Sequence, residues 1–561
     1  MIETSHREAS TETPQPVSES VSKRRLVFIV IGVLLGMLLG AVDQTVVGTA
    51  MPQIIADLHG LQHYAWVFTA YMLASTVSVP IYGKLSDIYG RRGFFLVGMI
   101  LFLTGSALSG MSQSMTQLIL FRGLQGLGAG AMLPIAIAII GDVFPPSERG
   151  KWQGLTGAVF GLASIVGPTL GGWITDNWGW PWVFYVNMPI GAVALVTAGL
   201  AIPSMARRRQ HRIDYIGAAL LILGTVPLLL AFTWGGDTYP WGSVQIIGML
   251  AFAAVALVAA FIWESRVAEP IISPSLFKNS IFTVSVLASF LASAGMFGAV
   301  MYLPLFIQGV VGNTATNSGV VLTPMMLGFI ASSIVGGQLL ARTGKYKVLA
   351  IVSFGIGALG AFLLSRMDAS VSDGVVVRNM VITGLGIGVS MSLFTIITQN
   401  AFPVQKLGEV TASLQFFRSI GGTIGVAVLG TVMTSRYNAV FASNVPAELR
   451  AQLTPEQLAA LQNPQSLMAP ESGGAIQQMF AGFGAQGQEI LGQVMLAIRE
   501  SLATAITDLF VVTTIALVLA MVSCFFLKEI PLRKTNRVEA STEVAQLEEV
   551  AEPPAPVGAD D

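Results

Sequence analysis

Charged residues are scarce in this chain, and cysteine and histidine are scarcer. Only 11% of the 561 residues are charged, against about 25% in soluble domains, and 53% are apolar. A soluble chain of this length would need far more charge to cover its surface. The single cysteine, Cys524, excludes an internal disulfide, an iron–sulfur cluster and a thiolate zinc site. The composition therefore predicts an all-α polytopic membrane protein, with the lipid bilayer as its main partner.

The motifs of several enzyme classes are also missing. The chain contains no G-x-x-x-x-G-K-[ST] phosphate loop, no H-E-x-x-H zinc motif and no G-x-S-x-G nucleophile elbow. The four histidines fall in tails and loops, and a net charge of −1 provides no basic field for nucleic acid. We therefore expect no enzymatic activity, cofactor, metal site or nucleic-acid partner.

Long apolar runs take the place of these features. A membrane core about 30 Å thick needs about 20 apolar residues per helix. By this length we expect fourteen membrane-spanning helices, at 26–50, 64–82, 94–112, 118–141, 152–174, 180–203, 213–233, 244–263, 281–309, 318–341, 347–365, 376–401, 408–434 and 502–527.

Basic residues predict the orientation of these helices. Most Lys and Arg residues fall on the side of the N-terminus, so the positive-inside rule places both termini in the cytoplasm. We expect the protein in the cell (inner) membrane. We expect disordered cytoplasmic tails at 1–25 and 528–561, and a long outer loop at 436–501 whose last part is an amphipathic helix.

An internal repeat links two loops on the predicted cytoplasmic side. GKLSDIYGRR begins at Gly83 and GQLLARTGKY begins at Gly337. Gly83 matches Gly337, Gly90 matches Gly344, and a basic residue follows the second glycine in both copies. Eight predicted helices separate the copies, which indicates two six-helix halves with two inserted helices. A parallel repeat of this kind is typical of transporters.

Five motifs then resemble one family. GKLSDIYGRR (83–92) resembles the loop motif of the major facilitator superfamily. AVDQTVVGTAMP (41–52), LFRGLQGLGAG (120–130), GLASIVGPTLGG (161–172) and WGWPWVFYVNMPIG (178–191) are similar to motifs of its fourteen-helix drug:proton antiporter branch, in the same order.

The resemblance covers almost the whole chain apart from the tails and the outer loop. It implies an N-terminal half at 26–203, two linker helices and their loops at 204–280, and a C-terminal half at 281–527. One departure is Pro181, where the branch usually has an arginine between two tryptophans, so an outer salt bridge at this point is not expected.

Two motifs suggest how the protein changes conformation. The loop motif resembles a latch that holds the two halves together when the inner side is closed; the simpler alternative is a basic loop that only sets topology. Its residues are Gly83, Asp87, Gly90, Arg91, Arg92 and, at the end of the fourth helix, Asp142. The helix 5 motif forms a kinkable stripe of small residues, which is either an antiport element or close structural packing. Its residues are Gly161, Gly167, Pro168, Gly171 and Gly172.

Asp43 and Arg122 are the strongest candidates for proton coupling. By a rise of 1.5 Å per residue, both lie in the outer half of the membrane, on the first and fourth helices. Desolvation favours a neutral carboxyl group and a nearby arginine favours the anion, so a change in their contact would load or release a proton. A fixed structural ion pair is the alternative.

Other polar and aromatic residues are candidates for lining a cavity. Arg418 is a cation within a predicted span, and such a charge is normally paired or hydrated. Aromatic rings can stack on flat or cationic molecules, although most membrane aromatics serve packing. The candidates are Trp66, Tyr71, Phe297, Gln399 and Arg418.

These features predict a proton-coupled exporter of amphipathic drugs or toxic small molecules, which the resemblance implies are often cationic. We expect a monomer. Two alternatives stay open: an exporter of a lipid or lipid-linked molecule, and a membrane sensor on the same fold that does not transport.

Overall fold

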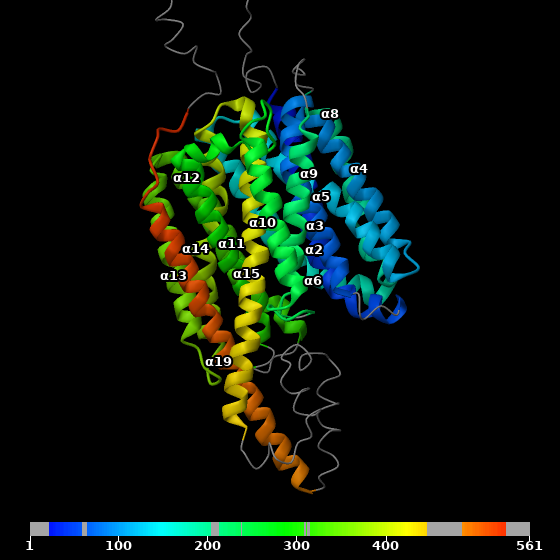
Figure 1. Cartoon of the computed structure of the whole chain (residues 1–561), viewed down its shortest axis with the longest axis vertical. Coiled ribbons are helices and arrows are strands. Elements are labelled where there is room, and N and C mark those ends of the chain that lie inside the picture. The colour runs from blue at the N-terminus through cyan, green and yellow to red at the C-terminus, as the bar shows by residue number, and fades with distance from the viewer. Residues whose placement is uncertain are drawn as a thin grey trace, which may run out of the picture.

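The molecule is a bundle of long helices that run roughly along its longest axis (Figure 1). The computed structural model describes residues 22–58, 64–203, 213–236, 238–307, 310, 315–445 and 485–533. In these ranges the only strand-like feature is one isolated bridge, between Gly235 and Tyr239. The predicted all-α membrane fold is confirmed, because thirteen helices of the described residues are long and apolar enough to cross a membrane.

Each predicted span overlaps an observed helix, and several of the helices extend beyond the predicted limits. Their bounds are α2 (Lys23–Leu58), α3 (Tyr64–Tyr89), α4 (Arg91–Gly110), α5 (Met115–Val143), α6 (Pro146–Trp178), α7 (Pro181–Tyr185), α8 (Asn187–Ala201), α9 (Tyr215–Trp234), α10 (Val244–Glu264), α11 (Ser280–Phe306), α12 (Ala315–Thr343), α13 (Tyr346–Ser365), α14 (Asp373–Asn400), α15 (Leu407–Asn444) and α19 (Ala485–Cys524). The predicted sixth span is divided into α7 and α8. A fourteenth long helix, α3, is not among the thirteen apolar ones and carries Lys84 and Asp87 at its end.

Two groups of helices each bury their own apolar core. The buried side chains of α2 to α8 form two apolar clusters, and those of α11 to α15 with α19 form two others. The two groups meet along two seams, where α6 packs on α12 and α3 packs on α15. We call the end of the bundle where α2 begins the N-terminal end, and the opposite end the far end.

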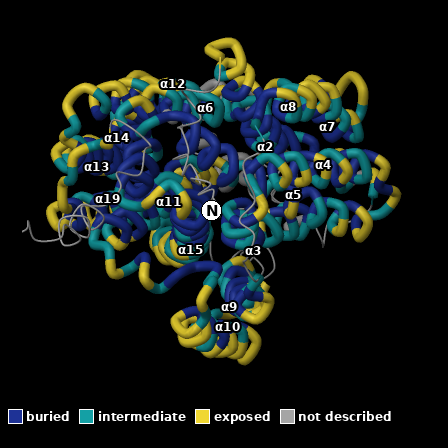
Figure 2. Tube along the Cα trace, turned by 90° about the horizontal axis from the view of Figure 1, so that it is seen from above, coloured by how far each residue is buried: buried dark blue, intermediate teal, exposed yellow. Residues whose placement is uncertain are grey.

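Helices α9 and α10 pack as a pair outside the two groups (Figure 2). They lie beside α3 and α15, where Leu221 and Leu229 of α9 share an apolar cluster with Val79 of α3 and Phe416 of α15. The inserted pair therefore covers one of the two seams.

Large apolar side chains remain exposed around the bundle, including Leu200, Val244, Val255 and Phe526. A soluble protein rarely exposes so many. A lipid environment accounts for these exposed apolar side chains, because a helix satisfies its own backbone hydrogen bonds and needs no polar surface in lipid.

The structure corrects the predicted limits of the outer loop. On its first side the predicted loop is too long, because α15 continues to Asn444. On its second side the helix expected at the end of the loop is continuous with the last span, as α19, which begins at Ala485. Tyr437 and Phe441, one turn apart on α15, are fully buried, and their apolar cluster includes Val494 of α19. The two helices thus extend as a packed pair beyond the bundle (Figure 1). Residues 446–484 lie outside the described residues.

The predicted disordered tails are corrected at their inner ends. Lys23 begins α2, and the segment after α19 is fixed to the bundle. The Tyr346 hydroxyl donates to the Lys528 carbonyl at 2.6 Å, and the Arg533 amide donates to Asn400 Oδ1 at 3.0 Å. Residues 1–21 and 534–561 lie outside the described residues.

Candidate functional site

A buried carboxylate lies at the centre of the first half. Asp43 of α2 is 1% exposed and accepts three hydrogen bonds. Arg122 Nη1 of α5 lies 2.6 Å from Asp43 Oδ2, and Gln125 Nε2, one turn further along α5, lies 2.8 Å from Oδ1. Asn187 Nδ2 of α8 lies 3.0 Å from the same Oδ1. The carboxylate thus joins three helices of one half.

Arg122 is enclosed as tightly as its partner. It is 1% exposed, its Nη1 also donates to Gln125 Oε1 at 2.8 Å, and its guanidinium carbon lies 4.3 Å from the centre of the Tyr71 ring. The Phe184 ring lies on it at 5.8 Å. Within the described residues its Nε has no hydrogen-bond partner, although the side chain is buried.

The sequence predicted that Asp43 and Arg122 share a depth, and the structure places them in contact. It did not identify Gln125, Asn187 or Ser106, whose hydroxyl accepts from Asn187 Nδ2 at 3.0 Å. The spacing from Arg122 to Gln125 on one helix face was an available signal for the first, whereas nothing in the sequence singled out Ser106.

A second cluster closes the N-terminal end along the seam of α3 and α15. Asp87 Oδ1 accepts from the Gly408 amide at 3.1 Å, and Oδ2 accepts from the Glu409 amide at 2.7 Å. These amides belong to the first turn of α15, where backbone donors have no partner in their own helix. Asp87 of one half therefore caps a helix of the other.

Arg91 holds Asp87 in this position. It forms an ion pair with Asp87, and its Nε donates to Asp142 Oδ2 at 2.7 Å. Gly90, at φ +102°, allows α4 to begin directly after α3 and brings Arg91 back towards Asp87. Arg92 is half-buried and takes part in none of the ion pairs that the described ranges contain.

Gly83 and Gly337, matched in the repeat, both lie where the halves touch. A Cβ at Gly83 would lie 2.9 Å from the Gly408 carbonyl oxygen of α15. A Cβ at Gly337 would overlap the backbone of Gly150 on α6. Gly344 has a positive φ of 66°, as its counterpart Gly90 does. The repeat thus places equivalent close approaches on both seams.

The seam of α6 and α12 also receives a polar contact from α14. Arg149 of α6 is 1% exposed and donates to Gln399 Oε1 at 3.3 Å, and Gln399 Nε2 donates to Thr411 Oγ1 at 2.9 Å. Gln399, predicted as a cavity residue, therefore lies in the contact that closes the N-terminal end.

The glycines of the predicted stripe on α6 pack against two different helices, α12 and α2. A Cβ at Gly161 would overlap the Ile330 side chain of α12, whereas one at Gly171 would lie 2.7 Å from the Val46 carbonyl of α2. Gly167 faces Thr45 of α2 in the same way, and Pro168 lies between these glycines. A Cβ at Gly172 would meet nothing within 4 Å, so Gly172 is not part of the close packing.

Two small cavities lie between the halves near the middle of the bundle. One, of about 90 Å³, is lined by Tyr71 and by Gln415 of α15. The other, of about 20 Å³, is lined by Gln415, Arg418 and Ser392. Tyr71 and Arg418, two of the candidates from the sequence, thus each line one of these cavities, and their part in binding stays a prediction.

Two predicted cavity residues lie elsewhere. Trp66 packs its ring on Trp234 of α9, with the centroids 5.4 Å apart, so it attaches the inserted pair to α3. Phe297 covers Gly422 of α15 and lines neither of the two cavities. The sequence could not separate these positions, because it gives the depth of a side chain and not the direction in which it points.

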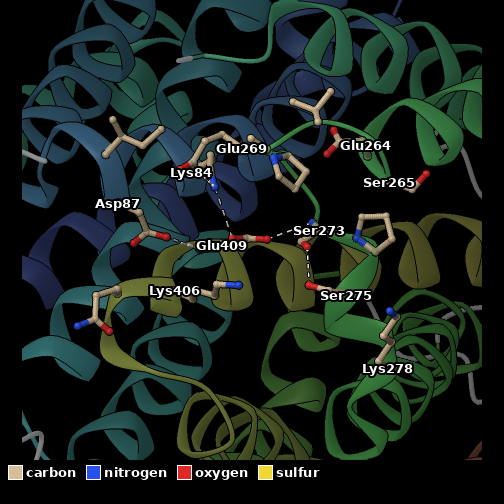
Figure 3. A pocket seen from close by; sticks show the side chains of 16 residues that line it. Lys84, Asp87, Glu264, Ser265, Glu269, Ser273, Ser275, Lys278, Lys406 and Glu409 are labelled. Carbon is tan, nitrogen blue, oxygen red and sulfur yellow. Dashed lines mark hydrogen bonds and ion pairs between the residues drawn. The ribbon is translucent and has the colours of Figure 1, made fainter. Parts of the chain in front are cut away.

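A larger hollow of about 450 Å³ opens at the N-terminal end beside Asp87 (Figure 3). Lys84 Nζ lies 2.8 Å from Glu269 and 3.7 Å from Glu409 of α15. The Ser273 amide donates to Glu409 Oε1 at 3.0 Å. The segment between α10 and α11 is thereby tied to the same contact that Asp87 makes.

Comparisons with known proteins give a consistent result. A family model described as Major Facilitator Superfamily matches residues 33–426. Multidrug transporter protein MdtP of Bacillus subtilis (strain 168) is 41% identical over 530 residues, which cover 92% of this chain and 95% of that protein. Multidrug resistance protein 3 of the same organism is 39% identical over 510 residues, 91% and 96% of the two chains. The solved structure of the human organic anion transporter MFSD10 (TETRAN) covers 89% of this chain and 100% of its own, with a TM-score of 0.57 and 15% identity, which supports the fold alone.

Proposed function

The chain belongs to the Major Facilitator Superfamily, as its motifs predicted, and we propose that it exports amphipathic small molecules in exchange for protons. The family is one of membrane transporters and not of enzymes. The names of two relatives of almost the same length, a multidrug transporter and a multidrug resistance protein, support drugs or toxic small molecules as the exported class.

The observation that carries this proposal is the buried pair of Asp43 and Arg122. A carboxylate in a dry site changes its proton occupancy when its cation moves. Tyr71 lies on Arg122 and also lines the cavity of about 90 Å³ between the halves. Proton occupancy at Asp43 is thus linked, through one aromatic ring, to the space that a transported molecule would enter.

We place the N-terminal end of the bundle in the cytoplasm, at the inner membrane. Basic residues concentrate there, which the positive-inside rule favours. These are Lys23, Arg24, Arg25, Arg91, Arg92, Arg149, Lys151, Arg342, Lys345 and Lys347. In this orientation both seams are closed on the cytoplasmic side.

Alternating access then follows from the two clusters. Asp87 holds α15 while the cytoplasmic side is closed, and its release lets the halves separate at that end. A proton on Asp43 removes the counter-charge of Arg122 and favours an arrangement in which Arg122 finds another partner or water. Deprotonation towards the cytoplasm restores the pair and completes the cycle.

Purified protein in proteoliposomes tests this proposal directly. An imposed pH gradient should drive accumulation of a fluorescent amphipathic dye, and Asp43→Asn should abolish that accumulation. The matched control is Asp508→Asn, since Asp508 pairs with Arg436 near the far end and is partly exposed. If the parent moves no dye under any gradient, export of amphipathic dyes is refuted, and the same assay with a labelled lipid then separates a lipid exporter from a sensor that does not transport. If Asp43→Asn couples as the parent does, Asp43 is not the coupling site.

A further inference from the structure

Arg418 is a second cation in the middle of the membrane. It lies eleven residues after Leu407, the first residue of α15, and is therefore about 16 Å along a helix that crosses a core of about 30 Å. It is 7% exposed. A charge at this depth is costly to insert into a membrane unless a partner or water compensates it.

The contacts of Arg418 are weak for a buried arginine. Its Nη1 donates to Gln415 Oε1 at 3.3 Å, and its Nη2 donates to the Met391 carbonyl at 3.3 Å. Both acceptors are neutral, and both distances are long for a charged donor, which prefers about 2.7–2.9 Å. Among the described residues no carboxylate forms an ion pair with it, whereas Arg122 has Asp43 at 2.6 Å.

Arg418 lies where the two halves of the molecule meet. It lines the cavity of about 20 Å³ with Ser392 and Thr395 of α14 and Thr156 of α6, so both halves contribute to the lining. Gln415 also lines the neighbouring cavity of about 90 Å³. Among the described residues, no acidic side chain lines either cavity.

We propose that Arg418 selects the charge of the transported molecule and that the preferred substrates carry an anionic group, such as a carboxylate, sulfonate or phenolate. This inference rests on the proposed export function. An anion would supply the counter-charge that the described residues do not provide, and the planar fork of arginine matches a carboxylate with two parallel hydrogen bonds.

The same geometry disfavours lipophilic cations. A cation in these cavities meets the uncompensated charge of Arg418, and the lining that the structure describes offers it no acidic side chain. The nearby carboxylate of Asp43 already accepts from Arg122, Gln125 and Asn187. The structure therefore favours anionic over cationic amphiphiles, in contrast to the cationic drugs that the sequence resemblance implied.

Equilibrium binding to the purified full-length protein tests this selectivity without a proton gradient. Three probes share one fluorophore and differ in charge: dansyl-aminocaproate is an anion, its methyl ester is neutral and dansylcadaverine is a cation. The parent should bind the anion more tightly than the cation. Arg418→Gln should weaken binding of the anion by about tenfold or more and leave the cation unchanged or tighter, since a hydrogen bond to a charged group contributes about 1.5–3 kcal/mol.

Two further variants separate charge from structure. Arg418→Lys keeps the charge and should recover part of the affinity for the anion. Arg436→Gln removes an arginine of the same helix that is paired with Asp508 and half-exposed, and should bind all three probes as the parent does.

Equal binding of anion and cation by the parent, or no binding of the anion, overturns the inference, and so does an equal loss of all three probes in Arg418→Gln. The parent's own preference keeps the test valid even if Arg418→Gln does not fold. Selective binding of the anion without any flux driven by a pH gradient supports the inference while refuting the proposed export function, so the two failures are distinguishable.

Discussion

Replacing Asp87 with asparagine tests the closure of the N-terminal end most directly. The asparagine side chain would keep nearly the same shape, but it offers one acceptor oxygen in place of two and carries no charge. The carboxylate of Asp87 now accepts from two backbone amides, Gly408 N and Glu409 N, that belong to the other half of the molecule. The substitution removes one of these bonds and the charge assistance of the other.

The size of the effect follows from these two bonds. Hydrogen bonds to charged groups contribute about 1.5–3 kcal/mol, against about 0.5–1.5 kcal/mol for neutral pairs. The ion pair with Arg91 lies within one half and persists when the halves separate, so it does not enter the difference. A net loss of about 2 kcal/mol shifts the equilibrium towards the state open at the N-terminal end by about 30-fold.

Cysteine labelling measures this shift. Ser392→Cys is nearly isosteric and places a thiol on a cavity that is closed in the structure, where Ser392 is 3% exposed. Cys524, the one natural cysteine, is buried and adds little background. An impermeant maleimide applied from the side of the N-terminal end should react about 30-fold faster when Asp87→Asn is added, because the rate follows the open population.

A matched control is Asp142→Asn. Asp142 accepts from Arg91 Nε at 2.7 Å, a bond between α4 and α5 of the same half. Asp142→Asn should accelerate labelling much less than Asp87→Asn, although both substitutions remove a buried carboxylate beside Arg91. Equal acceleration by the two variants, or none by Asp87→Asn with transport intact, would refute the role given to the Asp87 contacts across the seam.

Three further predictions address other parts of the molecule. Arg122→Ala should impair pH-driven export more than Arg122→Lys. In Asp43→Asn, detergent-solubilised protein should release no protons on substrate binding between pH 5 and 9. Proton release like that of the parent would contradict the coupling role of Asp43. Gly150→Ala should prevent full closure of the seam and speed labelling at the cavity, because its Cβ would overlap the backbone of α12. The control is Gly172→Ala, whose Cβ would meet nothing within 4 Å. It should leave labelling unchanged and raise helix stability by up to about 1 kcal/mol. Glu269→Gln removes the partly exposed ion pair with Lys84 of α3. The labelling rate should therefore change by less than about fivefold, and only at low salt. A larger change that persists at high salt would contradict the small contribution expected of this ion pair.

The sequence by itself determined the membrane class, the fourteen helices and the repeat. Hydropathy and length depend on local composition, so no packing was needed to find these features. Depth along a helix is equally local, which is why the sequence could place Asp43 and Arg122 at one level. The matched Gly90 and Gly344 were also visible in the sequence, and both have positive φ angles in the structure.

Only the tertiary structure decided which partners these residues have. Asn187 and Gln125 complete the site of Asp43 because α8 and α5 turn those faces inwards, and a helix's rotation about its own axis is set by packing and not by its composition. Trp66 and Gln399 had suitable chemistry but point into other contacts for the same reason. Across the seam, the partners of Asp87 are two backbone amides, which no side chain in the sequence reveals. These amides can donate to Asp87 only because α15 begins at that point. They lie more than three hundred residues after Asp87 in the chain and meet it across the seam of α3 and α15.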